Sequence, residues 1–172
     1  VAWVSGVGEV ALSDIDMDAV TRAEVDRHPV RCPDPETAER MAAEILAARE
    51  AQDSVGGVIS CVCRNVPAGL GEPVFDKLEA KLAQAMLSLP AAKGFDIGSG
   101  FSGARMRGSR HNDPFVRKQE RLGTLTNRSG GIQGGISNGE PIFFSVAFKP
   151  PATIGLAQAT VDFEGKPVSL EE

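Results

Sequence analysis

Lys149 and Thr153 are the residues whose types and spacing most directly suggest chemistry. Lys149 ends an apolar run, Pro150 and Pro151 follow it as a rigid turn, and Thr153 places a hydroxyl just beyond. A lysine ammonium binds phosphate as a point charge, and a threonine hydroxyl can donate a hydrogen bond to it. The spacing fits a phosphate clasp, although by itself it does not establish one.

A second candidate is the basic segment 105–128. It holds seven basic residues against Asp113 and Glu120, a net charge of +5 in a chain of net charge −5, so the remainder carries −10. Such a concentration indicates either an anion-facing loop or a solvated, mobile connector. The Asn112-Asp113-Pro114 turn and the weak periodicity favour a long loop or lid. His111 lies inside it, where it could touch a phosphate, but no carboxylate at a useful spacing makes it a base.

A third candidate is the glycine-rich segment 129–140, which repeats Gly-Gly-Ile and ends in Asn138-Gly139. Clustered glycines indicate positive φ angles or an approach too close for a Cβ atom. Asn138-Gly139 predicts a type I′ hairpin turn, which needs positive φ at both central residues. At the doublets 130–131 and 134–135, close approach of a ligand or of neighbouring backbone is the better explanation.

Several kinds of site are not indicated by the sequence. Cys61-x-Cys63 has the wrong spacing for common zinc or redox motifs, so Cys32, Cys61 and Cys63 are expected to be reduced thiols, and we predict no metal site. His28 precedes a proline and is expected in a turn. We find no phosphate-loop motif, dinucleotide fingerprint, paired-carboxylate motif or Ser/His/Asp set. Mild acidity argues against nucleic acid or anionic membranes as partners, and no apolar run is long enough for a membrane span. The first residues lack the basic region of a signal peptide, and a start without methionine suggests a fragment.

The helices and strands expected from the sequence must position these candidate residues. They indicate one α+β domain over residues 1–172. Apolar periodicity predicts helices over 35–52 and 74–89, the second with an apolar stripe of Phe75, Leu78, Leu82, Ala85, Met86 and Leu89. Ser13 to Asp16 offer N-caps for a short helix that ends before His28. Strands are expected within 1–12, 58–66, 91–98 and 141–148, and a strand-turn-strand unit over 159–170 with its turn at 164–166.

The residues then support a resemblance that goes further than periodicity. Four segments are similar to the chorismate synthase family, in the same order and with the same spacing: PAGLGEPVFDKL at 67–78, KGFDIG at 93–98, TNRSGGIQGGISNGE at 126–140 and AFKP at 147–150. The resemblance extends through essentially the whole chain, as a core portion of such an enzyme.

The resemblance implies a fold and a function. The family fold is a β-α-β sandwich, with antiparallel sheets packed on central helices, assembled as a homotetramer in the cytoplasm. The implied activity is a carbon-oxygen lyase of the shikimate pathway, in aromatic amino acid biosynthesis. It converts 5-enolpyruvylshikimate-3-phosphate to chorismate by 1,4-elimination of phosphate. The implied cofactor is reduced FMN, with NADPH as the source of its electrons, although the sequence does not say whether the enzyme has its own flavin reductase.

The family's flavin contacts carry over onto eight positions of this chain. They are Pro90 and Ala91 at a helix-to-strand corner, Gly134 in the second doublet, and the lysine-proline turn Lys149, Pro150, Pro151, Ala152 and Thr153. The chain departs from the commoner Lys-Pro-Thr-x-Ser/Thr pattern at Pro151, which has neither a hydroxyl nor an N–H. Pro90 likewise cannot donate, where some relatives carry asparagine.

Three family motifs have no counterpart here: the Gly-Glu-Ser type, Arg-x-Ser-x-Arg-Glu and Gly-Arg-His-Asp-Pro. The family's catalytic histidines lie in those parts, and neither His28 nor His111 replaces them. We therefore expect no catalytic residue in this chain, and no activity from it alone. Two other interpretations stay open, a non-catalytic flavin- or phosphate-binding module and a subunit-interaction domain.

Overall fold

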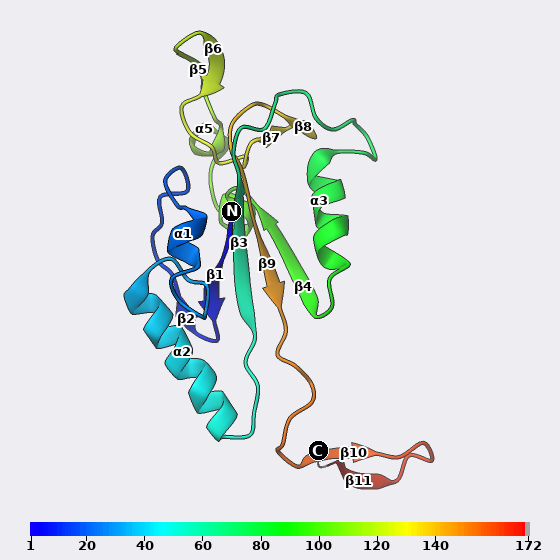
Figure 1. The fold of residues 1–172 in the computed structure, drawn as a ribbon. Coiled ribbons are helices and arrows are strands. Elements are labelled where there is room, and N and C mark those ends of the chain that lie inside the picture. The colour runs from blue at the N-terminus through cyan, green and yellow to red at the C-terminus, as the bar shows by residue number, and fades with distance from the viewer. Residues whose placement is uncertain (171–172) are drawn as a thin grey trace.

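The computed structural model describes residues 1–170 and is built on a five-stranded antiparallel sheet of order β2-β1-β3-β9-β4 (Figure 1). Its strands are β1 (Ala2–Val7), β2 (Val10–Ala11), β3 (Gly57–Cys63), β4 (Ala92–Ile97) and β9 (Ile142–Phe148). Alternate residues of β9, namely Ile142, Phe144 and Val146, are buried in one apolar cluster. The α+β class and the four predicted strand regions are confirmed.

The helix α2 (Pro35–Glu50) begins and ends close to its predicted bounds. The Asp34 carboxylate accepts a hydrogen bond from the Thr37 N–H, and Pro35 occupies the first turn, where its missing N–H costs nothing. Ala38 and Met41 are fully buried beside Val7 and Cys32. The small alanine face therefore brings α2 close to the β1–β2 edge of the sheet.

The helix α3 (Leu78–Leu87) is shorter than predicted, and its predicted start at residue 74 is wrong. A turn closed by the Glu72 N–H and the Asp76 carbonyl, 2.9 Å apart, occupies that stretch and leaves Phe75 90% exposed. Leu78, Leu82 and Met86 do pack on the β9 cluster, whereas Ala85 and Leu89 are exposed. The apolar periodicity correctly predicted which face of α3 is packed. It could not predict the preceding turn, because that turn depends on backbone hydrogen bonding.

The short helix before His28 is α1 (Arg22–Val25), and its N-cap is Thr21, not a residue of 13–16. Thr21 and Glu24 form a reciprocal capping box, whereas Asp16 accepts bonds from the N–H groups of Asp18 and Ala19 in a separate turn. Val25 packs with Trp3 of β1. No helix within residues 1–170 is long and apolar enough to cross a membrane.

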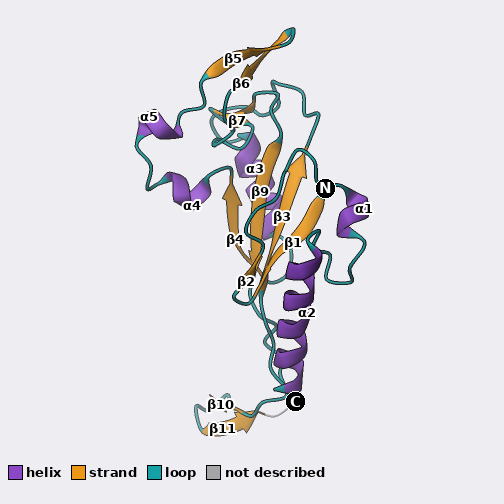
Figure 2. Ribbon diagram, turned by 90° about the vertical axis from the view of Figure 1, so that its left-hand side faces the viewer, coloured by secondary structure: helices purple, strands orange, loops and turns teal. Residues whose placement is uncertain are grey.

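The basic segment is not the long loop that weak periodicity predicted. It contains α5 (Gly108–His111) and a hairpin of β5 (Phe115–Lys118) with β6 (Arg121–Thr124) that projects from the end of the sheet (Figures 1 and 2). The short helix α4 (Gly100–Gly103) comes just before the segment. Most side chains of this hairpin are exposed. With so little burial, no alternation of apolar and polar residues was needed, so the sequence carried no strand signal.

The type I′ turn lies in the doublet at 134–135, and its predicted place at Asn138-Gly139 is wrong. Gly134 and Gly135, with φ of 61° and 90°, join β7 (Ile132–Gln133) to β8 (Ile136–Ser137). Asn138 is held differently, because its N–H donates to the Gly131 carbonyl and its side chain accepts from the Glu140 N–H. Backbone pairing, not the Asn-Gly dipeptide, therefore decides where the chain reverses.

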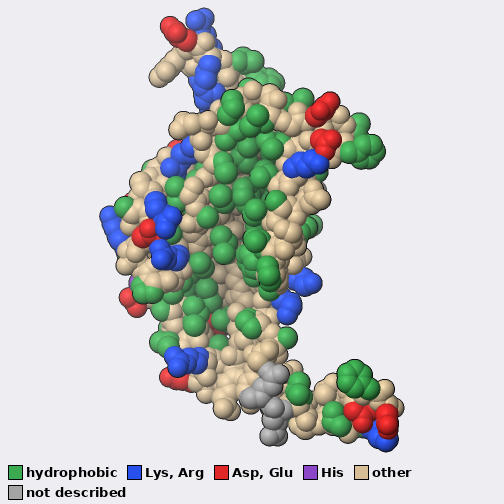
Figure 3. All heavy atoms as spheres, turned by 45° about the vertical axis from the view of Figure 1, so that its right-hand side comes forward, with side chains coloured by type: hydrophobic (Ala, Val, Ile, Leu, Met, Phe, Trp, Pro, Cys, Tyr) green, Lys and Arg blue, Asp and Glu red, His purple; other side chains and the backbone are tan. Residues whose placement is uncertain are grey.

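The C-terminal strand-turn-strand unit is confirmed as β10 (Gln158–Val161) and β11 (Pro167–Leu170), with Gly165 at φ 80° in the turn. It extends away from the sheet at the opposite end from the basic hairpin (Figure 1). Figure 3 shows a long band of apolar side chains down one face of the molecule. Exposed apolar residues include Ile45 and Leu46 of α2, Ile59 of β3 and Leu87 of α3.

Candidate functional site

The helix-to-strand corner and the lysine-proline turn lie side by side. α3 ends at Leu87, Ala91 adopts a φ of 64°, and its carbonyl accepts a 3.0 Å hydrogen bond from the Lys149 N–H. Pairing of β4 with β9 continues up to this point, since Ala92 lies opposite Phe148. The structure therefore brings together seven of the eight predicted site residues: Pro90, Ala91 and the turn 149–153.

The lysine-proline turn is held by the loop that follows α2. The Ser54 hydroxyl donates a 2.6 Å bond to the Pro151 carbonyl. A Cβ atom at Gly56 would lie 2.6 Å from the Phe148 carbonyl oxygen, so only glycine allows this approach. The Lys149 and Thr153 side chains are exposed, and within residues 1–170 the Lys149 ammonium donates a hydrogen bond only to the Pro150 carbonyl, at 3.3 Å. An exposed ammonium beside an exposed hydroxyl, with no carboxylate of residues 1–170 paired to the lysine, is chemically suited to phosphate.

Gly134 lies at the other end of α3, where the Gly135 carbonyl accepts from the Leu78 N–H at 2.8 Å. A helix of 10 residues is about 15 Å long, so Gly134 is separated from Pro90 by roughly that distance. A Cβ atom at Gly134 would meet no protein atom within 4 Å, so the positive φ of the turn is the observed reason for glycine, and its flavin contact stays a prediction. Close approach of backbone is confirmed at Gly130 and Gly131 instead, where a Cβ would lie 2.6 Å from the Gly98 nitrogen and the Pro141 oxygen.

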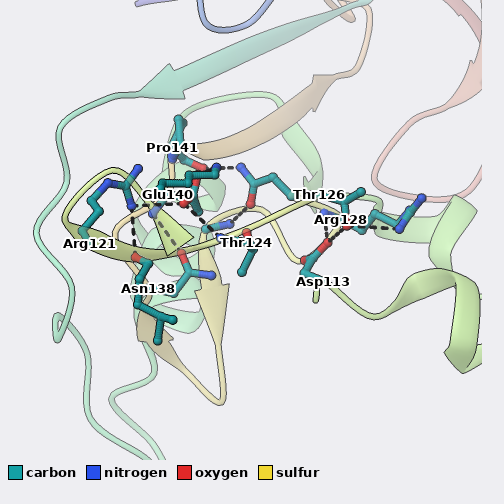
Figure 4. Close-up of polar contacts among 12 residues, drawn as sticks. Asp113, Arg121, Thr124, Thr126, Arg128, Asn138, Glu140 and Pro141 are labelled. Carbon is teal, nitrogen blue, oxygen red and sulfur yellow. Dashed lines mark hydrogen bonds and ion pairs between the residues drawn. The ribbon is translucent and has the colours of Figure 1, made fainter. Parts of the chain in front are cut away.

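Glu140 is the residue that most strongly organises this end of the molecule, and sequence reasoning missed it. Its side chain is 5% exposed and binds the Lys118 ammonium at 2.8 Å and the Arg121 guanidinium at 3.1 Å (Figure 4). The Thr124 N–H donates to the same carboxylate at 3.2 Å. Burial acts to raise the pKa of Glu140, but these donors outweigh it and hold the pKa below its usual value. Its only sequence signal was its position as the one acid of the glycine-rich segment 129–140.

Asp113 forms a second buried carboxylate cluster. It accepts hydrogen bonds from the Thr126 hydroxyl at 2.6 Å and from the N–H groups of Arg128 and Ser129 at 2.8 Å (Figure 4). Burial again acts to raise the pKa, and the three donors lower it overall. The residue thus ties α5 to the start of the glycine-rich segment.

These two clusters change the interpretation of the basic segment. Lys118 and Arg121 are used internally, to hold the hairpin on Glu140. Arg105, Arg107 and Arg110 are exposed and form no ion pair within residues 1–170. Part of the segment is therefore structural, and these three arginines retain the charge that could face an anion.

Both histidines have partners that the sequence did not indicate. His111 Nε2 lies 2.8 Å from the Ser99 hydroxyl oxygen. His28 accepts a bond from the Val30 N–H in its turn, as expected, and its Nε2 lies 3.4 Å from a Glu39 oxygen. His111 therefore faces a hydroxyl and no carboxylate, and the Glu39 carboxylate near His28 is exposed and lies beyond the 2.6–3.2 Å reach of a catalytic hydrogen bond.

The cysteines are free thiols, as expected. Cys32 is buried beside α2, whereas Cys61 and Cys63 are half-buried against the β9 cluster. Burial, reinforced by Cys63, raises the pKa of Cys61 to about 11. No group of three or more metal-ligating side chains gathers anywhere in the described residues.

Comparison with known proteins bears directly on this arrangement. A family model described as chorismate synthase matches residues 1–171. The chorismate synthase of Schizosaccharomyces pombe is 58% identical over 151 residues, covering 87% of this chain and 38% of the relative. That of Opitutus terrae is 59% identical over 163 residues, covering 92% of this chain and 45% of the relative.

A crystal structure of a chorismate synthase superimposes with a TM-score of 0.79 at 32% identity, over 87% of this chain and 48% of that one. The chain thus spans less than half the length of these relatives. Because the family model covers nearly every residue and these two relatives exceed 50% identity, the chain belongs to the chorismate synthase family.

Proposed function

We propose that this chain carries part of the flavin site of a chorismate synthase, which eliminates phosphate from 5-enolpyruvylshikimate-3-phosphate. The observation that carries the proposal is the hydrogen bond from the Lys149 N–H to the Ala91 carbonyl. It joins two segments that are far apart in sequence and that the family resemblance assigns to the same cofactor.

The available groups fit a flavin phosphate. Lys149 supplies a point charge, and Thr153 supplies a hydroxyl, both exposed at one turn. Pro150 and Pro151 give the turn a fixed backbone but no N–H donors, so donation falls to Lys149, Ala152 and Thr153. When bound, reduced FMN would lend electron density to the substrate as phosphate leaves. The work of this chain is to position that group.

A local group of exposed arginines supports an anionic substrate. The substrate bears two carboxylates and a phosphate, and Arg105, Arg107 and Arg110 are exposed without ion-pair partners among residues 1–170. A cluster of exposed positive charges raises the local concentration of an anionic substrate and speeds its association with the protein. We assign these arginines to substrate attraction rather than to the elimination itself.

The proposed assembly is the β-α-β sandwich and homotetramer of the family, acting in the cytoplasm, with reduced FMN maintained by NADPH. The exposed apolar band of Figure 3 supports it, because monomers rarely leave a large contiguous apolar surface in water. In the sandwich, such a surface would be covered by further protein.

Lys149→Ala in the intact enzyme tests the flavin assignment. Loss of a hydrogen bond to a charged group should weaken FMN binding by about 1.5–3 kcal/mol. The measurement is a calorimetric titration, and Lys93→Ala, which removes another exposed lysine from β4, is the matched control. A dissociation constant unchanged by Lys149→Ala would reject the role.

The chain alone should be inactive and should bind FMN no more tightly than about micromolar, because the clasp is only partly present. An anaerobic assay with reduced FMN and a fluorescence titration measure the two quantities. Turnover by residues 1–172 would contradict the prediction that the chain alone is inactive. Tight FMN binding without turnover would favour a non-catalytic flavin-binding module. Light scattering, which measures the oligomeric state, distinguishes the remaining alternative, because a subunit-interaction domain would self-associate without flavin.

A further inference from the structure

A cavity of about 280 Å³ lies where α3, the end of β4, α5 and the glycine-rich segment meet. It is at the N-terminal end of α3, whereas the lysine-proline turn is at the other end. Its lining includes Glu79, Ile97, Ser99, His111, Arg128 and Ile132. The volume is just below the ~300 Å³ at which sites for drug-sized ligands begin, so it suits a smaller molecule.

The cavity contains opposite charges that do not neutralise each other. Glu79 Oε2 is buried and accepts no hydrogen bond from residues 1–170. Arg128 donates from its side chain only to the Thr126 hydroxyl, at 3.1 Å, and forms no ion pair with Glu79 or any other described acid. Figure 4 shows its side chain running away from the Glu140 cluster. A buried carboxylate oxygen without a donor is costly, so a ligand that supplies one gains that energy.

The cavity is also rigidly walled. The Ser99 N–H donates to the Arg128 carbonyl at 2.7 Å, and the Ser99 hydroxyl meets His111 Nε2 at 2.8 Å. A Cβ atom at Gly103 would lie 2.4 Å from that hydroxyl oxygen, so glycine is needed for the contact. Ile97 and Ile132 extend the apolar core to the cavity and provide a dry surface beside the charges.

We propose that this cavity binds a small apolar α-amino acid. Its ammonium group would donate to Glu79, its carboxylate would accept from Arg128, and its side chain would lie against Ile97 and Ile132. A simple anion would face the Glu79 carboxylate, and a simple cation would face the Arg128 guanidinium. A zwitterion carries a donor for Glu79 and an acceptor for Arg128 in one molecule, and His111 and Ser99 add polar partners for the carboxylate.

The competing explanation is that Glu79 stabilises the start of α3, since an acid in the first helical turn interacts favourably with the helix dipole. Glu36 occupies the equivalent first turn of α2 and is exposed, so Glu36→Gln is its matched control. Arg117→Gln, an exposed member of the same basic segment, is the control for Arg128→Gln.

The test is calorimetric titration of the 172-residue chain with leucine and phenylalanine. Their decarboxylated amines and deaminated acids serve as probes that lack one charge. We expect saturable binding of the amino acids only, and a loss of more than about tenfold for Glu79→Gln and for Arg128→Gln, with both control variants unchanged.

Two results would overturn the proposal. One is equal binding of the deaminated acids, or no binding of either amino acid up to about 10 mM. The other is a Glu79→Gln variant that melts at a lower temperature but binds as tightly as the unmodified chain, which would assign Glu79 to α3 alone. Circular dichroism of each variant confirms that a loss of binding is not a loss of fold.

Discussion

At the residue scale, Asp113 and Glu140 hold the basic segment in place through hydrogen bonds and ion pairs. Each side chain is almost fully buried, and its carboxylate oxygens accept hydrogen bonds from donors in that segment. Because those donors favour the charged form, the folded pKa of both groups is lowered. Protonation must therefore oppose folding, and the size of the effect can be measured.

Acid should destabilise the chain through Asp113. A lowered folded pKa contributes stability that is complete above the unfolded value of about 3.9 and is lost as pH falls through the folded value. Asp113→Asn should therefore lower the unfolding free energy near neutral pH by about 1–3 kcal/mol and flatten its decline below about pH 4. Urea unfolding across that range measures both effects. Asp18→Asn, at an exposed position, should keep the original acid dependence, and a similar flattening there would contradict the assignment.

Two glycines of the same segment should respond differently to alanine. Gly131 has a φ of 79° and its Cβ would lie 2.6 Å from the Pro141 oxygen, whereas Gly134, with φ 61°, opens onto free space. Gly134→Ala incurs only left-handed backbone strain, about 1–2 kcal/mol. Gly131→Ala adds a backbone clash and should cost more than about 3 kcal/mol in denaturant unfolding. Equal losses at the two positions would show that the clash is relieved by a small shift.

At the scale of elements, the start of α2 could be predicted from local sequence, whereas the start of α3 could not. The start of α2 is marked by Asp34 and Pro35, which are local signals, and its packing face repeats at helical spacing. The start of α3 has no side-chain cap, since Lys77 makes no capping bond. Its boundary is set by the Gly135 carbonyl, a residue far along the chain, and local sequence cannot report that contact.

Removing the α2 cap tests the local signal. Asp34→Ala deletes the acceptor of the 2.7 Å bond from the Thr37 N–H and should lower Tm by about 3 °C. Asp34→Asn keeps a capping oxygen and should melt close to the unmodified chain. Differential scanning calorimetry distinguishes the pair. If both variants melted alike, the Asp34 charge rather than the hydrogen bond would be responsible.

At the scale of the whole molecule, the two projecting hairpins differ in how they are attached. The β5–β6 hairpin is held at its base by Glu140, while the β10–β11 hairpin has almost entirely exposed side chains, with Phe163 fully exposed. Within residues 1–170, the last backbone hydrogen bond from this end of the chain to the body runs from the Gly155 N–H to the Gln52 carbonyl, at 2.9 Å. The C-terminal hairpin therefore adds little to the stability of the sheet.

Truncation after Leu156 should leave Tm unchanged within about 2 °C, because residues 157–170 bury little apolar surface on the body. Leu82→Ala, on the packed face of α3, should lower Tm clearly and shows that the assay detects a loss of core contact. A truncated chain that melted well below the full one would mean that the hairpin packs on the body in solution.

The sequence by itself determined the family, α2, the main sheet strands and the lysine-proline turn, because periodicity, capping residues and motifs act over a few neighbouring positions. It placed seven site residues in segments that the fold does bring together. Tertiary structure alone decided the roles of Glu140 and Asp113, the pairing of Ser99 with His111, and the turn at Gly134-Gly135. Those features depend on contacts between distant segments, where the partner of a buried charge or backbone group is chosen by packing.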